Sequence, residues 1–151
     1  MDGSTKSTFT RKPPGHTPPP WINSGALFFI TICCEERGDA GLCEPDRAFS
    51  ILDSVRSYHE QERWFARLFL LMPDHIHALV AFPPDSRMSE TLRNWKRFVA
   101  RESGVKWQRG YFDHRIRDSD NLQMKAAYIR ENPVRKGLVM SSEQWPYVFE
   151  S

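Results

Sequence analysis

The sequence predicts an α+β domain of ferredoxin-like topology, with strands and helices in the order β-α-β-β-α-β and a further helix after them. One observation behind this prediction is that runs rich in β-branched and aromatic residues alternate with segments of helical periodicity. Another is length, because 151 residues suffice for one compact core and hardly for two. In this topology the helices lie on one face of an antiparallel sheet and leave the other face available for a ligand.

The N-terminal residues 1–24 are rich in proline and poor in apolar side chains, a composition that resists both helix and strand. We therefore predict a flexible arm in front of a domain that spans residues 25–140. The first strand is expected at 26–34, which is rich in Phe, Ile and Thr and precedes a charged loop. A helix is then expected from Pro45 to about residue 60.

The middle of the domain contains two strand-like runs, RWFARLFLL at 63–71 and HIHALVAF at 75–82. The link between them is so short that they should be antiparallel neighbours. A second helix is expected from Ser89 to Glu102, because apolar residues recur there at helical spacing. A fourth strand is expected at 111–117, where the side chains alternate as in a half-buried strand.

The third helix should begin at a cap formed by Asp118, Ser119 and Asp120 and run to about Glu131. We expect Pro133 to stop it, because proline disfavours helical backbone at the residue before it. Residues 141–151 are interpreted as a C-terminal tail.

Two histidines interrupt the otherwise apolar strand at 75–82. Residues i and i+2 of a strand point to the same side, so His75 and His77 should present two imidazoles from one face, with backbones about 7 Å apart. Ile76 should point the other way and pack under the helices. Such a pair can hold a metal ion, although a packing or hydrogen-bonding role explains two histidines about equally well.

The third helix carries a polar line formed by Asn121, Lys125, Tyr128 and Asn132. A phenol with a pKa near ~10 attacks at neutral pH only with help, and a divalent metal on a phosphate oxygen would provide that help. Asn132 could add an amide oxygen to the two histidines, giving a mixed nitrogen and oxygen ligand set that accepts several divalent ions, Mn²⁺ and Mg²⁺ among them, so the sequence does not identify the ion. A tyrosine at the edge of the core is the alternative reading of Tyr128.

The segment 93–117 combines many cations with aromatic residues, which favours single-stranded nucleic acid as the partner. We expect Trp107 and Tyr111 to be accessible, and His114 to be buried or hydrogen-bonded. Arg115 and Arg117 are the preferred phosphate contacts, on the open face of the sheet. The candidate DNA-binding residues are Arg93, Lys96, Arg97, Arg101, Arg115, Arg117 and Lys125.

Two motifs resemble a known family. MPDHIHALV at 72–80 resembles the signature of the single-tyrosine HUH transposases, in which two histidines flank a hydrophobic residue. YFDHRIRDSDNLQMKAAYIRENPVRKGLV at 111–139 resembles the C-terminal block of their REP-associated branch, the REP-associated tyrosine transposases. The resemblance runs from about residue 18 to 140, and the joint occurrence of both motifs makes it specific.

The resemblance implies a metal-dependent single-stranded DNA endonuclease and strand transferase that cuts near a DNA hairpin. Tyr128 would attack the scissile phosphate, giving a 5′-phosphotyrosine link and a free 3′-hydroxyl. His75, His77 and Asn132 would hold the divalent metal ion, Mg or Mn.

Two other functions remain open: a non-catalytic single-stranded nucleic-acid-binding protein derived from a transposase, and a small metal-dependent hydrolase in which Tyr128 has no task. The three cysteines lack the spacing of a zinc site or of a disulfide framework, and no apolar run is long enough to span a membrane. We therefore expect a soluble, cytoplasmic protein. A homodimer is compatible with the sequence, although no apolar stripe requires one.

Overall fold

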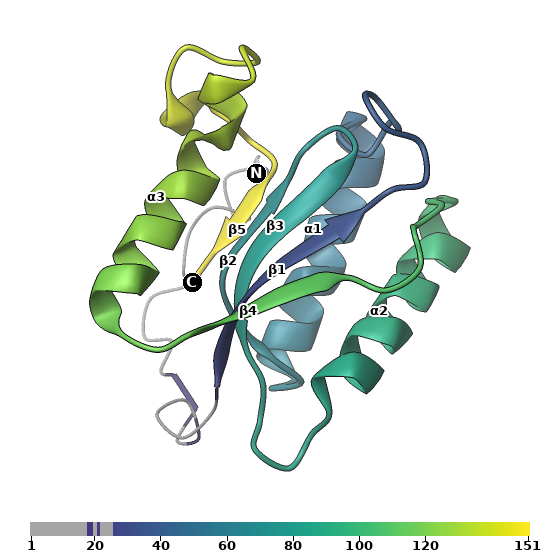
Figure 1. Cartoon of the computed structure of the whole chain (residues 1–151). Helices are drawn as coiled ribbons and strands as arrows, with labels where there is room; N and C mark the ends of the chain where they lie inside the picture. Colours follow the sequence, from purple (N-terminus) through teal and green to yellow (C-terminus); the bar gives the residue numbers. More distant parts are fainter. Residues whose placement is uncertain (1–17, 20, 22–25) are drawn as a thin grey trace.

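The computed structural model describes residues 18–19, 21 and 26–151. Its elements are β1 (Leu27–Cys33), α1 (Pro45–Glu60), β2 (Phe65–Leu71), β3 (His75–Ala81), α2 (Met88–Ser103), β4 (Phe112–Ile116), α3 (Ser119–Arg135), the short 3-10 helix η3 (Ser142–Gln144) and β5 (Val148–Glu150) (Figure 1). The predicted arm at 1–24 lies largely outside the described residues.

The strands form one antiparallel sheet in the order β4-β1-β3-β2-β5. Its first four strands have the ferredoxin-like arrangement, which confirms the predicted fold class. Residues 141–151, interpreted from the sequence as a tail, contain η3 and the edge strand β5, which pairs with β2 along Leu68–Leu70. A strand of three residues is too short to show a periodic pattern, and the burial of Phe149 is what keeps it in place.

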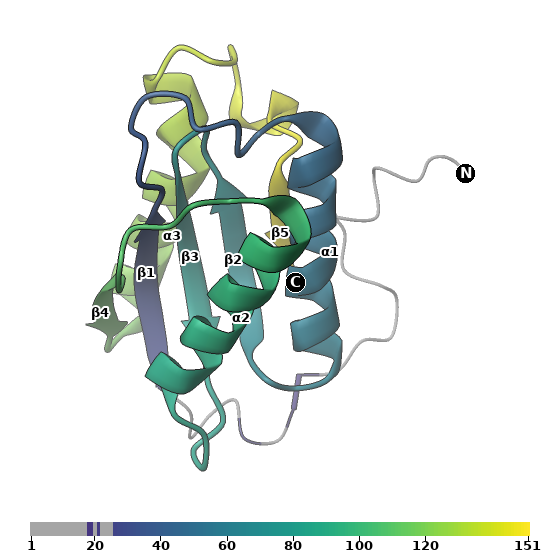
Figure 2. The ribbon, with the colours of Figure 1, turned by 90° about the vertical axis from the view of Figure 1, so that its right-hand side faces the viewer.

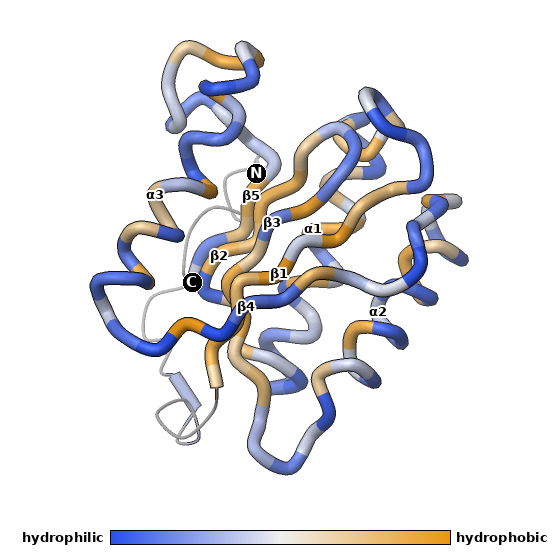
Figure 3. The backbone as a smooth tube through the Cα atoms, viewed as in Figure 1, coloured by the Kyte–Doolittle hydropathy of each residue, from blue (hydrophilic) through white to orange (hydrophobic). Residues whose placement is uncertain are grey.

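The helices lie on both faces of the sheet. Figure 2 shows α1 and α2 on one side and α3 on the other. The larger core lies beneath α1 and α2, where Trp64, Phe69 and Trp95 pack with ring centroids 5.3–5.7 Å apart. A smaller core joins Leu79 of β3 to Ile129 of α3. Apolar residues therefore concentrate along the strands, with hydrophilic residues on the loops (Figure 3).

Helix α3 begins as predicted, because the Asp118 side chain accepts a hydrogen bond from the backbone N–H of Asn121 at 2.8 Å. The prediction that Pro133 stops the helix is wrong. A proline this close to the C-terminus removes a single hydrogen bond, and the following turn closes through Lys136 N–H to Asn132 O at 3.0 Å and Leu138 N–H to Pro133 O at 2.9 Å. Asn132 is therefore helical and lies one turn after Tyr128 on α3.

Cys33, Cys34 and Cys43 are free thiols. Burial raises the pKa of Cys34 to about 11 and that of Cys43 to about 12, so both stay protonated at neutral pH. Within the described part of the chain, no helix has the length and apolarity needed to cross a membrane.

Truncation of Phe69, which is fully buried between Trp64 and Trp95, should destabilise the fold strongly. We expect Phe69→Ala to lower the free energy of unfolding by about 3–5 kcal/mol in urea denaturation, because the cavity cannot close around rigid indole rings. Phe98→Ala is the control, since Phe98 is 38% exposed on α2 and its truncation should cost much less. Equal losses for the two variants would contradict this picture of the core.

A candidate metal and tyrosine site

His75 and His77 project from β3 toward the face that α3 covers. In the antiparallel register His77 lies opposite Thr31 and His75 opposite Cys33 of β1. Leu79, two residues further along the strand, packs in the core beneath α3, whereas Ile76 packs in the core beneath α1 and α2. The predicted alternation is therefore correct, and the two imidazoles share one face.

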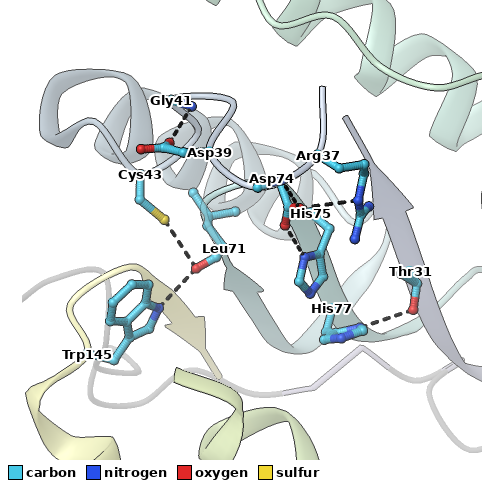
Figure 4. Close-up of polar contacts among 11 residues, drawn as sticks. Thr31, Arg37, Asp39, Gly41, Cys43, Leu71, Asp74, His75, His77 and Trp145 are labelled. Carbon is cyan, nitrogen blue, oxygen red and sulfur yellow. Dashed lines mark hydrogen bonds and ion pairs between the residues drawn. The ribbon is translucent and has the colours of Figure 1, made fainter. Parts of the chain in front are cut away.

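Both imidazoles are tethered through the same ring nitrogen (Figure 4). Nδ1 of His75 lies 2.6 Å from Oδ1 of Asp74, and Nδ1 of His77 lies 3.0 Å from Oγ1 of Thr31. The rings are 4.7 Å apart between centroids. Because a metal-bound histidine commonly has its second nitrogen hydrogen-bonded to a carboxylate or hydroxyl, Nε2 is the nitrogen of each ring that could bind a metal ion.

Asp74 links His75 to the loop after β1. Its Oδ2 accepts a hydrogen bond from the backbone N–H of Gly38 at 2.8 Å and lies 3.2 Å from Nε of Arg37. Burial alone would raise the pKa of Asp74, but the hydrogen bonds from His75 and Gly38 and the charge of Arg37 outweigh it and lower the pKa below its ordinary value. The carboxylate is thus a stable acceptor for His75. Sequence reasoning missed this role, although an acid directly before the histidine pair is a recognisable signal.

His77 is held in its neutral form. Burial is the largest cause and lowers its pKa to about 3, with further lowering by the charges of His75, Arg135 and Lys136. Its side chain is enclosed by Phe29 and Tyr128, with ring centroids 5.4 Å and 5.8 Å away. A neutral imidazole is the form that binds metal ions, so the surroundings of His77 suit that role at neutral pH.

Tyr128 lies beside the histidine pair, on the surface of α3 that faces the sheet. Its ring is 5.8 Å from that of His77, and the side chain is 48% exposed, so a ligand can reach it. The guanidinium of Arg135 lies 4.3 Å from the ring centroid, and Nη2 of Arg135 donates a hydrogen bond to the Tyr128 carbonyl at 2.7 Å. The structure therefore places Tyr128 beside the pair formed by His75 and His77, although about fifty residues separate them in the sequence. It also adds Arg135, to which the sequence analysis gave no role.

Asn132 lies on the same helix as Tyr128, one turn further on, and is only 4% exposed. Among the described residues, no group of three or more His, Cys, Asp or Glu side chains gathers in a metal-binding arrangement. A site built on the two histidines thus needs oxygen donors of another kind, such as the Asn132 amide, a phosphate or water. A mixed set of imidazole nitrogens and oxygen donors is compatible with several divalent ions.

The four predicted DNA-binding residues of α2 do not share this site, because α2 packs on the opposite face of the sheet. Nζ of Lys96 is occupied by the carbonyls of Gln108 and Gly110 at 3.0 Å and 2.6 Å. Lys125 of α3 is on the histidine face, with its ammonium 5.2 Å from the ring centroid of Phe29. The other three predicted DNA-binding residues of α2 are Arg93, Arg97 and Arg101.

Edge strand β4 differs from its predicted exposure pattern. Arg115 lies opposite Phe28, which packs beneath the α1 and α2 helices, so it is on the α2 face and not on the open face. The prediction that His114 is buried or hydrogen-bonded is wrong, because α3 covers only the Ile116 end of this strand and leaves His114 exposed. Arg117, just beyond the strand, is exposed, and its contact with phosphate stays a prediction.

The aromatic residues that are most accessible also differ from those expected. Trp107 and Tyr111 are half-buried against the larger core, whereas Phe112 is 68% exposed. Alternation along β4 places Phe112 on the histidine face, opposite Thr31 in the register. The alternation of side chains in the sequence predicts that Phe112 and Tyr111 point to opposite faces. It does not predict that β4 lies at the edge of the sheet, where Phe112 is exposed.

Comparison with known protein sequences gives a consistent result. Residues 30–132 match the family described as IS200-like transposases. The chain is 29% identical over 144 residues to a protein assigned as a REP-associated tyrosine transposase in Haemophilus influenzae, covering 83% of this chain and 80% of the relative. It is also 29% identical over 82 residues to the REP-associated tyrosine transposase of Escherichia coli, covering 52% of this chain and 50% of the relative.

Two solved structures share the fold. One is a REP-associated tyrosine transposase bound to a REP hairpin, with a TM-score of 0.72, 23% identity, and coverage of 82% of this chain and 76% of that chain. The other, from Deinococcus radiodurans, is assigned as a transposase and has a TM-score of 0.53, 16% identity, and coverage of 79% and 95%. At these identities the likeness shows the fold, and the sequence matches show the family that the two motifs resemble.

The low pKa of His77 makes the stability of the protein depend on pH. The folded-state pKa of about 3 lies below the ordinary value of 6.5, so the unfolded chain binds the proton first as the pH falls. Stability should therefore decline from about pH 6.5 toward pH 3. Urea unfolding at pH 7 and pH 5 in a chelator should show a smaller decline for His77→Asn than for the unchanged protein. The same decline in both would exclude His77 as the cause.

Proposed function

The chain belongs to the family of IS200-like transposases, enzymes that act on DNA, and from this premise we propose that it cleaves and rejoins single-stranded DNA through a covalent bond to Tyr128. The observation that carries the proposal is the 5.8 Å separation of the Tyr128 and His77 rings, which puts a phenol beside a tethered histidine pair within one chain. We propose the reaction to be metal-dependent, with the DNA cut next to a hairpin. A structurally similar transposase is bound to a REP hairpin, which supports a hairpin as the partner.

In the proposed reaction Tyr128 Oη attacks the scissile phosphorus. The phenol loses its proton, the bond between phosphorus and O3′ breaks, and O3′ takes up a proton. The products are a 5′-phosphotyrosine link and a free 3′-hydroxyl, and attack by another 3′-hydroxyl on that link would transfer the strand. The 48% exposure of Tyr128 leaves room for the phosphate. Arg135, 4.3 Å from the ring, can offset negative charge as it develops there.

The histidines supply the second half of the site. A divalent ion held by Nε2 of His75, Nε2 of His77 and the amide oxygen of Asn132 would withdraw charge from a phosphate oxygen and make the phosphorus easier to attack. Asp74 and Thr31 each hold one ring through Nδ1, which supports a role for the opposite nitrogen, Nε2, in binding the ion. The low pKa of His77 keeps its imidazole neutral and able to bind.

A covalent adduct is the direct test. The protein, a labelled single-stranded DNA hairpin and Mn²⁺ should give an adduct that survives denaturing electrophoresis, and Tyr128→Phe should abolish it because the nucleophilic oxygen is gone. The fragment released upstream should be extended by a DNA polymerase, which requires a free 3′-hydroxyl. Tyr58→Phe is the matched control, because Tyr58 lies on α1 across the sheet and should leave the yield unchanged.

An adduct that persists in Tyr128→Phe would show that another residue is the nucleophile. Cleavage without any adduct would indicate a metal-dependent hydrolase, and binding without cleavage would indicate a non-catalytic single-strand binder. Loss of the adduct in chelator, and in His75→Ala and His77→Ala, is the result expected from a metal-dependent site.

Asp74 should control metal affinity through His75. We expect Asp74→Asn to weaken Mn²⁺ binding, measured by calorimetry, by about 10- to 100-fold, because the imidazole loses its charged hydrogen-bond partner. Asp39→Asn in the loop after β1, which Asp74 contacts through Gly38, is the control, since the Asp39 carboxylate accepts a hydrogen bond from Gly41 N–H and not from a histidine. Similar affinities for both variants would exclude a supporting role for Asp74.

A further inference from the structure

A hollow lies on the opposite side of the sheet from Tyr128, between α2 and the segment 104–111 that leads into β4. Figure 1 shows this segment running from the end of α2 back toward the sheet edge. The hollow has a volume of about 530 Å³, within the range of small-molecule binding pockets. We call it the α2 pocket; its lining includes Arg93, Lys96, Arg109, Trp107, Tyr111 and Glu35.

The walls of the α2 pocket are fixed before any ligand arrives. Nζ of Lys96 donates hydrogen bonds to the carbonyls of Gln108 and Gly110, and Nε1 of Trp107 donates one back to the Lys96 carbonyl at 3.0 Å. Gly110 has a φ of +76°, which lets the segment turn tightly beneath Lys96. The helix and the segment therefore hold each other, so binding need not order a loop.

The composition of the α2 pocket suits a nucleotide. Arg93 and Arg109 supply guanidinium groups for a phosphate, while Trp107 and Tyr111 supply flat rings for an unstacked base. The groove between α1 and α2 differs in charge, because its two acids, Asp53 and Glu102, outnumber its one cation, Arg63. In the α2 pocket three cations face a single acid, Glu35. Five of the cationic and aromatic residues of segment 93–117 thus line one pocket, away from the histidines: Arg93, Lys96, Trp107, Arg109 and Tyr111.

We propose that the α2 pocket binds one unstacked nucleotide of the single-stranded DNA, with its phosphate at Arg93 and Arg109 and its base against Trp107 or Tyr111. This rests on the proposed function in one respect, that single-stranded DNA is the ligand. The protein would then hold the strand at two places, one at the scissile phosphate and one across the sheet.

The sheet edge offers a route between the two places. Tyr111 lines the α2 pocket, and its neighbour Phe112, 68% exposed, lies on the histidine face at the start of β4. Phe112 is opposite Thr31, which is opposite His77, so two strand spacings, about 10 Å, separate Phe112 from His77. A DNA strand that crosses this edge of the β-sheet would meet Tyr111 on the pocket side and Phe112 on the histidine side.

The affinity for single-stranded DNA of variants that each remove one positive charge, inside or outside the pocket, tests the proposal. All variants carry Tyr128→Phe, so that no cleavage occurs, and the probe is a short fluorescein-labelled single-stranded oligodeoxynucleotide of mixed sequence followed by anisotropy. Arg93→Ala and Arg109→Ala should each weaken binding by about tenfold or more, because each removes a charged hydrogen-bond donor to phosphate. Arg87→Ala at the start of α2 and Lys106→Ala in the segment remove the same charge outside the pocket, and should weaken it much less.

Equal weakening by all four variants would overturn the proposal, because it would mean that only the overall charge matters. The adduct assay uses intact Tyr128 and a different readout, so the two proposals can fail separately.

Photocrosslinking gives a second, independent test. An oligodeoxynucleotide that carries 5-iododeoxyuridine joins on irradiation to an aromatic side chain in contact with the base. Crosslinks at Trp107 or Tyr111, lost in Arg93→Ala, support the pocket. Crosslinks confined to Phe112 or Tyr128 would show that the strand stays on the histidine face, and would overturn it.

Discussion

The alternation of side chains along β3 is the constraint on which the rest of the structure depends. This strand lies at the centre of the sheet, and each of its residues is buried against one helical layer or the other. Ile76 stabilises the larger core, while His75 and His77 lie under α3. A shift of one residue in register would put both imidazoles into the larger core and an isoleucine at the site, so the packing of the fold and the placement of the histidines are one requirement.

Burial of two imidazoles has a cost that the neighbouring groups offset. A polar ring nitrogen removed from water needs a partner, and Asp74 and Thr31 provide one for each ring. The same contacts prevent rotation about the side-chain bonds. Stability and preorganisation therefore have a common origin here, because the hydrogen bonds that make burial tolerable also aim the second nitrogen of each ring.

Much of the fold and of the candidate site was predictable from the sequence, because both depend on the local periodicity of side chains. The pairing of His75 with His77 follows from strand geometry, and the fold class follows from the order of elements. Asp74 was not recognised because two of its partners, Arg37 and Gly38, come from a loop far away in the chain. The passage of α3 through Pro133 was also missed, since hydrogen bonds formed beyond a proline decide whether a helix continues.

Helix α3 is secured at both ends to opposite edges of the sheet. It follows β4 directly, and the chain beyond it returns to pair β5 with β2, where Nε1 of Trp145 donates to the Leu71 carbonyl at 3.0 Å. The segments on both sides of α3 are therefore paired into the sheet that the helix covers. The phenol of Tyr128 and the imidazole of His77 consequently belong to one folded polypeptide, and the fold itself sets the spacing between their rings.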